Sequence, residues 1–259
     1  MKIQKTLAFD DVLLRPRYSD IQSRSSIELT SSISDLSFRL PIISSPMDTV
    51  TETDMLVAMD SRGGFGVAHR YNTITEQSRI VHKAHALGAQ NIGAAIGVSG
   101  DYIDRAKSLV MAGANILCID IAHGHHSLMK NALKCIKSMF VSNVYVIAGN
   151  VATLEGFNDL ADWGADAIRV GIGGGSICST RIQTGHGVPT FQSVMDCSSS
   201  DRDAAIIADG GIRTSGDLSK AIAAGADFVM LGSGLAGTDE SPGEIIHSVT
   251  GDPHGSKRK

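Results

Sequence analysis

A glycine-rich loop that runs into a cysteine has the clearest chemical meaning of any segment in this sequence. Residues 171–181 read Gly-Ile-Gly-Gly-Gly-Ser-Ile-Cys-Ser-Thr-Arg, with glycine at four of the first five positions. Glycine lets the backbone approach a ligand closely, and its amides or carbonyls can then face a phosphate or an ion. A cysteine that follows such a loop can be held beside a bound small molecule. The segment therefore predicts covalent chemistry on a phosphorylated substrate.

Cys178 is the candidate nucleophile for that chemistry. A thiolate attacks electrophilic carbon readily, and a neighbouring cation or positive dipole lowers the pKa of the thiol. Cysteines in general are buried and inert, which is how we interpret Cys118 in a strand pattern and Cys135 in a helix pattern. Thr180 and Arg181 follow Cys178 and favour the reactive interpretation. The four cysteines form no CxxC pair or spaced zinc-ligand set, so we expect reduced, intracellular thiols.

Polar residues gather at the ends of the strand-like segments. Turn chemistry alone explains one such cluster, but seven clusters on one face of a barrel indicate an active site. The clusters are 44–48, 69–70, Asp120 with His123, 149–150, 171–181, 209–211 and 232–234.

The last two clusters suit phosphate and ribose binding. Loops after the seventh and eighth strands are the usual phosphate position of such barrels, and the amides of Gly211, Gly232 and Ser233 are free to face oxygens. The carboxylate of Asp209 can accept hydrogen bonds from ribose hydroxyls. The histidines within 123–126 lack the spacing of a zinc site, whereas carbonyls of the glycine loop suit a monovalent cation.

The elements that position these residues read as a (β/α)8 barrel. Near-continuous apolar strands alternate with helices, and several strands are preceded by a Gly-Ala-Asn or Gly-Ala-Asp turn, which implies a parallel sheet covered on both faces. An open doubly wound sheet is the alternative, but the GxGxxG expected after its first strand is absent. We predict helices at 103–112, 127–140 and 216–224, among others. The eight predicted strands are 41–44, 65–69, 92–97, 116–120, 144–148, 167–171, 205–208 and 228–231.

The end of the sequence does not predict an eighth helix. Its last 16 residues are polar and include Gly251, Pro253 and Gly255. We therefore expect one catalytic barrel domain over 1–259 that is incomplete at its C-terminus and contains no inserted domain.

Composition narrows the class of protein further. A hydrophobic content of 42% supplies a core for 259 residues, and a net charge of −4 argues against nucleic-acid or anionic-membrane binding. No apolar run approaches the roughly 20 residues that cross a bilayer, and residues 1–11 lack the pattern of a signal peptide. We expect a cytoplasmic protein that does not bind membranes.

Six blocks of this sequence resemble the inosine monophosphate dehydrogenase and guanosine monophosphate reductase family. They occur in the family's order, and the likeness covers nearly the whole chain. The blocks are 8–14 (Ala-Phe-Asp-Asp-Val-Leu-Leu), 44–52 (Ser-Ser-Pro-Met-Asp-Thr-Val-Thr-Glu), 148–151 (Ala-Gly-Asn-Val), 175–178 (Gly-Ser-Ile-Cys), 207–212 (Ile-Ala-Asp-Gly-Gly-Ile) and 235–238 (Leu-Ala-Gly-Thr).

The resemblance implies a barrel that usually forms a square homotetramer and serves purine nucleotide biosynthesis with a nicotinamide cofactor and often potassium. By matching positions, Cys178 attacks C2 of the purine, Thr180 assists proton handling, and Asp120 contacts the nicotinamide ribose. The implied substrate-binding residues are Ser45, Met47, Asn150, Arg169, Ser176, Asp209, Gly211, Gly232 and Ser233. The implied potassium ligands are the carbonyls of Gly173, Gly175 and Cys178.

The family has two branches. Dehydrogenases oxidise IMP to XMP with NAD, and reductases convert GMP to IMP and ammonia with NADPH. Pro46 and the segment 238–244 resemble the dehydrogenase. Residues 70–73 run directly into the next helix without the regulatory modules that many dehydrogenases insert, as in reductases and some dehydrogenases. We predict an NAD-dependent IMP dehydrogenase, with GMP reductase as the alternative.

The sequence also departs from the family pattern. Gly174, His186 and Thr190 differ from the usual residues around the loop. A nucleotide-binding segment and a mobile flap, whose Arg-Tyr pair activates water in the dehydrogenase, do not occur in the printed sequence, so we expect this chain alone to turn over slowly. A nucleotide-binding barrel without activity and a flavin-dependent barrel enzyme stay open as alternatives.

Overall fold

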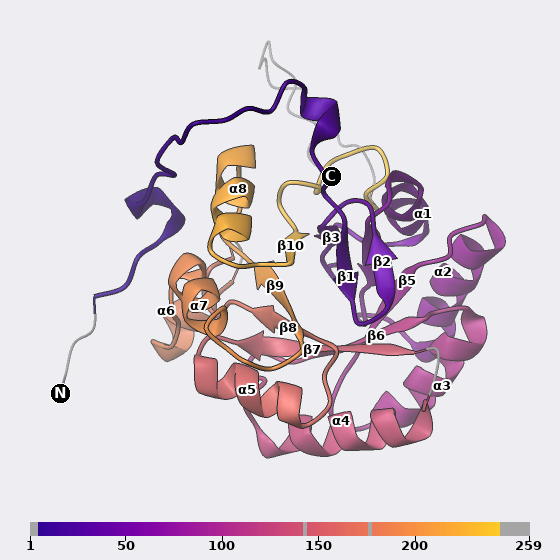
Figure 1. Ribbon diagram of the computed structural model, residues 1–259. Helices are drawn as coiled ribbons and strands as arrows, with labels where there is room; N and C mark the ends of the chain where they lie inside the picture. The colour runs from indigo at the N-terminus through magenta and orange to yellow at the C-terminus, as the bar shows by residue number, and fades with distance from the viewer. Residues whose placement is uncertain (1–4, 142–143, 176–177, 244–259) are drawn as a thin grey trace, which may run out of the picture.

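The fold is a closed parallel barrel surrounded by helices (Figure 1). The computed structural model describes residues 5–141, 144–175 and 178–243. The barrel strands follow one another in the order β10-β3-β4-β5-β6-β7-β8-β9, each parallel to its neighbours. Their bounds are β3 Ile42–Ser44, β4 Phe65–Ala68, β5 Ile92–Ile96, β6 Ile116–Asp120, β7 Tyr145–Val151, β8 Ala167–Val170, β9 Ala205–Asp209 and β10 Phe228–Leu231. The eight predicted strands and their closure into a barrel are confirmed.

Helices connect successive strands and lie outside the barrel (Figure 1). They are α1 Thr53–Arg62, α2 Ile74–Ala86, α3 Tyr102–Ala112, α4 Ser127–Met139, α5 Leu154–Asp162, α6 Thr180–Thr184, α7 Thr190–Cys197 and α8 Ser215–Ala223. The helices predicted at 103–112, 127–140 and 216–224 are confirmed as α3, α4 and α8. After β10, residues 232–243 form turns. No eighth barrel helix was expected for residues 244–259, and these residues lie outside the part of the chain that the structure describes.

The recurring Gly-Ala-Asn/Asp turn has a second role that its sequence did not reveal. The glycine ends a helix in the left-handed conformation, as at Gly113 (φ 114°). The polar side chain two residues later accepts a hydrogen bond from a backbone N–H near the start of the preceding barrel strand. These bonds run from Ile92 to Asn115 (2.8 Å), from Val146 to Asp166 (2.7 Å) and from Ile206 to Asp227 (2.7 Å). Each turn thus ties the start of one strand to the strand before it.

A short antiparallel hairpin, β1 (Ser31–Ile33) with β2 (Leu36–Phe38), was not predicted. Its Ile33 and Phe38 are buried in the cluster that fills the barrel interior. The Phe38 ring lies 4.7 Å from Phe65 and 5.6 Å from Phe228, centroid to centroid. Because Phe65 and Phe228 begin their strands, the hairpin covers the N-terminal end of the barrel. The C-terminal end is therefore the end where a site can open to solvent.

Candidate active site

An arginine flanked by two aspartates lies at the C-terminal mouth of the barrel. Arg169, on β8, donates to Asp209 of β9 through Nε (3.1 Å) and Nη2 (2.8 Å), and to the carboxylate of Asp120 on β6 through Nη1. Asn150 of β7 also donates to Asp209 (2.7 Å) and to the carbonyl of Gly171 (2.8 Å). Strand β7 extends beyond the predicted 144–148, so Asn150 belongs to the strand and not to the loop after it. Four predicted site residues are thus joined in one hydrogen-bonded network.

Arg169 is a permanent positive charge in this network. Its side chain is only 8% exposed, and such burial by itself lowers the pKa of a guanidinium. The carboxylates of Asp209 and Asp120 outweigh that effect and raise the pKa of Arg169 well above its usual value. All three described hydrogen bonds to Asp209 go to Oδ2. A carboxylate has about four acceptor positions, so Oδ1 keeps acceptor capacity for a ribose hydroxyl.

Arg70 is a member of the network that sequence reasoning did not assign to the site. It follows β4, and its Nη2 donates to the carbonyl of Asp120 (3.0 Å), while its Nε lies 3.9 Å from Oδ2 of the same residue. Its place in the polar cluster 69–70 at a strand end was the available signal. Asp120 therefore lies between the guanidinium groups of Arg169 and Arg70.

The cysteine loop packs backbone against backbone on the loop after β9. Gly171 has φ +146°, and a Cβ there would overlap the carbonyl oxygen of Asp209. Gly210 has φ +95°, and a Cβ there would lie 2.9 Å from the nitrogen of Gly175. Side chains at either position would push the two loops apart. These glycines therefore let the cysteine loop pack against the loop predicted to bind ribose and phosphate, whereas the sequence predicted only close approach to a ligand.

Cys178 has the environment of a reactive thiol. It is half-buried and belongs to neither apolar cluster of the core. The side-chain hydroxyl of Thr180 is the main cause that lowers its pKa; burial opposes this effect, and backbone groups of Thr180 and Gly173 and the charge of Arg181 add to it. By contrast, burial raises the pKa of Cys118 and of Cys197 to about 12. The structure thus separates one activated thiol from two inert ones.

Thr180→Val should raise the pKa of Cys178, because the substitution removes the hydroxyl that stabilises the thiolate. A thiol with a lowered pKa is ionised at lower pH, so wild-type Cys178 should react with iodoacetamide at a pH where ordinary cysteines are mostly protonated. The variant's rate-against-pH curve should move to higher pH, and its rate at pH 7 should fall about three- to tenfold. Mass spectrometry of the peptide containing Cys178 gives the rate. Thr180→Ser, which keeps the hydroxyl, is the control. Identical rate-against-pH curves for Thr180→Val and wild type would refute the role of the Thr180 hydroxyl in stabilising the thiolate.

The carbonyls predicted to bind potassium have other partners in this arrangement. The Gly173 carbonyl accepts a hydrogen bond from Nη1 of Arg181 (2.7 Å), and the Gly175 carbonyl accepts one from the Cys178 nitrogen (3.2 Å). The Arg181 guanidinium therefore places a positive charge beside the carbonyl oxygen that a potassium ion would have to bind. These groups fit potassium only after Arg181 moves away, so we derive no step through the ion. Among the residues described, no cluster of three or more His, Cys, Asp or Glu is placed to hold a metal.

The remaining predicted substrate residues that the structure describes lie in the loops at the mouth of the barrel. A Cβ at Gly232 would lie 3.0 Å from the Met47 sulfur and 3.1 Å from Ser45 Oγ, so the loops after β3 and β10 meet there. Ser45 Oγ is buried and has no hydrogen-bond partner within the described ranges. Gly211 packs against the carbonyl of Gly174. Ser233 is exposed; Ser176 lies outside the described residues.

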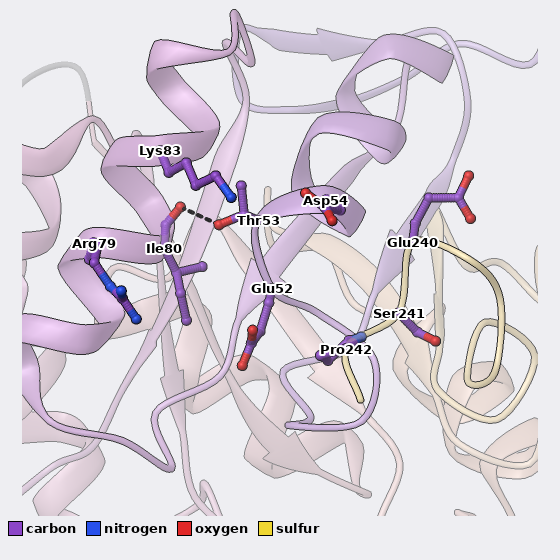
Figure 2. A pocket seen from close by; sticks show the side chains of 9 residues that line it. All are labelled: Glu52, Thr53, Asp54, Arg79, Ile80, Lys83, Glu240, Ser241 and Pro242. Carbon is purple, nitrogen blue, oxygen red and sulfur yellow. Dashed lines mark hydrogen bonds between the residues drawn. The ribbon is translucent and has the colours of Figure 1, made fainter. Parts of the chain in front are cut away.

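The described residues line at least two cavities. One, of about 350 Å³, lies behind the cysteine loop and is lined by Gly173, Gly174, Thr190 and Gly211 among others. The second, of about 230 Å³, lies between α1, α2 and residues 240–242, where Figure 2 shows polar side chains from both helices. No predicted site residue lines the second cavity.

In the described part of the chain, no helix has the length and apolar character needed to span a membrane.

Comparisons with known proteins match nearly the whole chain. Residues 6–254 match the family model described as "IMP dehydrogenase / GMP reductase domain". The inosine-5'-monophosphate dehydrogenase of Nitrosopumilus maritimus (strain SCM1) is 34% identical over 373 aligned positions, covering 95% of this chain and 78% of that protein. The corresponding Cryptosporidium parvum enzyme is 42% identical over 286 positions, covering 93% and 70%. A solved GMP reductase structure from Trypanosoma brucei has a TM-score of 0.90 and 29% identity, covering 96% of this chain and 87% of that one.

Proposed function

Because this chain belongs to the IMP dehydrogenase / GMP reductase family, we propose that it oxidises IMP to XMP with NAD. The observation that carries the proposal is the activated thiol of Cys178, on a loop packed against Asp209–Gly211 beside the Arg169 network. Such a site joins a nucleophile to groups that suit a ribose and a phosphate. Members of this family are oxidoreductases that use a nicotinamide dinucleotide.

The proposed reaction uses Cys178 as a covalent catalyst. The thiolate forms a bond to C2 of the hypoxanthine ring, and the hydrogen on C2 leaves with its electron pair as hydride. The nicotinamide supplies the acceptor for that hydride when bound. Water then adds to C2, the carbon–sulfur bond breaks, and XMP leaves with the thiolate restored. The balance is IMP, NAD and water giving XMP, reduced NAD and a proton.

The chain's own residues bind and orient the reactants. Asp209 accepts hydrogen bonds from the substrate ribose, and Asp120 does the same for the cofactor ribose. Arg169 holds both carboxylates in place, and Thr180 donates a hydrogen bond to the thiolate. The phosphate is bound by Ser176, Gly211, Gly232 and Ser233, and the base and sugar lie against Ser45, Met47 and Asn150.

GMP reduction is the second candidate, and the structural likeness to a GMP reductase favours it. In that direction Cys178 attacks C2 of GMP, ammonia leaves, and NADPH supplies the hydride that releases IMP. The same residues serve both reactions.

A single-turnover assay separates the candidates. Enzyme in excess over nucleotide is mixed with IMP and NAD, or with GMP and NADPH, while the absorbance of the reduced nicotinamide is followed. We expect an increase with IMP and NAD, even if later turnovers are slow. A decrease with GMP and NADPH, together with ammonia release, would establish the reductase. Nucleotide binding with neither change would support the inactive barrel, and flavin absorbance in the purified protein would support the flavin enzyme.

Three finer features belong to the same proposal. We propose a homotetramer, the use of NAD instead of NADPH, and a cytoplasmic location. The support for the first two is the resemblance of the sequence to the family, and the support for the third is the pattern of four unpaired cysteines. Light scattering of the purified chain and a comparison of the two dinucleotides address the first two.

A further inference from the structure

Thr190 carries a buried hydroxyl directly beneath the cysteine loop. It is the first residue of α7 and is 3% exposed. Its Oγ1 finds no hydrogen-bond partner among the residues described. A buried hydroxyl without a partner is unfavourable, and a residue of this shape has alternatives, such as valine, that avoid the penalty. The shape and position of the side chain, and not a hydrogen bond of its hydroxyl, are therefore what its contacts must explain.

The neighbour of this hydroxyl is Gly174. A Cβ at that position would overlap Thr190 Oγ1, while the next nearest atoms, of Gly210, lie at an ordinary 3.4 Å. Unlike Gly171 and Gly173, Gly174 does not have a positive φ, so its φ does not by itself disfavour an L residue. Of the neighbouring atoms of the described residues, Thr190 Oγ1 is the one that a Cβ at position 174 would overlap.

We propose that Thr190 is a positioning residue for Cys178, because its side chain supports the Gly174 backbone and holds the cysteine loop against Gly210. A catalytic role for this positioning rests on the proposed function. The contact between Thr190 and the Gly174 backbone does not depend on that function. Thr190 and Gly174 behave as a matched pair, because the Thr190 side chain fills the space that a side chain at position 174 would otherwise occupy.

The contact reaches Cys178 through the two residues beside Gly174. On one side, the Gly173 carbonyl holds Arg181, three residues beyond the cysteine (2.7 Å). On the other, the Gly175 carbonyl accepts a hydrogen bond from the Cys178 nitrogen (3.2 Å). A shift of the backbone at position 174 moves both anchors at once. Displacing this backbone should therefore change the reactivity of the thiol without touching it.

Reciprocal substitutions test the pair. Gly174→Ala adds a methyl group that meets Thr190, and Thr190→Ala removes the support. The double variant Gly174→Ala/Thr190→Ala removes the hydroxyl and methyl group of Thr190 and adds a methyl group at position 174, which should restore contact. Thr190→Val keeps the side-chain shape and removes the hydroxyl. Gly216→Ala is the matched control, since Gly216 lies in α8, does not have a positive φ, and has its nearest atom at 3.5 Å.

The readout is the rate of iodoacetamide reaction at Cys178 as a function of pH, measured by mass spectrometry. We expect about a tenfold lower rate at pH 7 for Gly174→Ala, a smaller loss for Thr190→Ala, and recovery to within about threefold of wild type in the double variant, as coupled neighbours require. Thr190→Val and Gly216→Ala should match wild type, and Thr190→Val should melt at a higher temperature. A double variant no more reactive than Gly174→Ala, or a Gly174→Ala variant that matches wild type, would overturn the proposal.

The design separates this inference from the proposed function and from misfolding. Alkylation needs no nucleotide, so the result stands whatever reaction the site performs. If the only effect of Thr190→Ala were a lower melting temperature, with an unchanged pH curve for Cys178, Thr190 would be a structural residue and the inference would fail. That comparison remains decisive if Gly174→Ala does not fold.

Discussion

Cys178→Ala is expected to abolish the reaction with purine nucleotide, with a fall in rate of about a thousandfold or more, because the substitution removes the proposed nucleophile that bonds to C2. Nucleotide binding should stay within about threefold of wild type, since the ribose and phosphate contacts come from other residues. The single-turnover absorbance change measures the reaction, and titration calorimetry measures binding.

Cys135→Ala is the matched control for this experiment. Cys135 is also half-buried but lies on α4, away from the mouth of the barrel. We expect it to leave both rate and binding unchanged. A Cys178→Ala enzyme that still produces reduced nicotinamide at a rate close to wild type would remove the basis of the covalent mechanism.

Arg169→Met is expected to cost the largest amount of stability of any single change at the site. The substitution leaves the carboxylates of Asp120 and Asp209 facing each other at the mouth without the charge that joins them. Removing one partner of a buried ionic network costs about 3–5 kcal/mol. The free energy of unfolding from urea denaturation measures the loss, and the rate of hydride transfer should fall with it, because both ribose-binding carboxylates lose their support.

An exposed arginine provides the comparison for Arg169. Arg202 also pairs with two carboxylates, Asp162 and Asp201, but on the surface. Exposed ion pairs contribute little to stability, so Arg202→Met should unfold at nearly the same urea concentration as wild type. Arg169→Lys keeps the charge but loses the bidentate geometry of the guanidinium. Its free energy of unfolding should lie between those of wild type and Arg169→Met. Equal stability of Arg169→Met and Arg202→Met would show that the network at the mouth stabilises the fold no more than an exposed ion pair does.

The barrel was predictable because its strands carry their own information. A strand buried on both faces reads as a short apolar run, as in Ile116–Asp120 and Phe228–Leu231, whose bounds match the predicted ones. Left-handed glycines such as Gly113 and Gly225 end the helices before these strands. These signals are local, because burial and backbone conformation act on residues that are adjacent in sequence.

The β1–β2 hairpin was not predictable for the opposite reason. Its strands have three residues each and are rich in serine, and its turn contains Ser34 with φ 52° instead of a glycine. Nothing in that pattern distinguishes it from a loop. Only the apolar space at the end of the barrel, between Phe65 and Phe228, accounts for the burial of Phe38.

The sequence by itself determined the strand order of a parallel barrel, the identity of the thiol at the end of a glycine loop, and the polar residues gathered at one end of the strands. The tertiary structure decided which of those residues meet: Arg169 between Asp120 and Asp209, Arg70 beside Asp120, and Thr190 under Gly174. These pairs are separated by 16 to 50 residues along the chain, as the positions show. Hydrophobic periodicity reports which face of a strand is buried, whereas the partner of a charge or of a missing Cβ depends on how the closed barrel brings distant loops together.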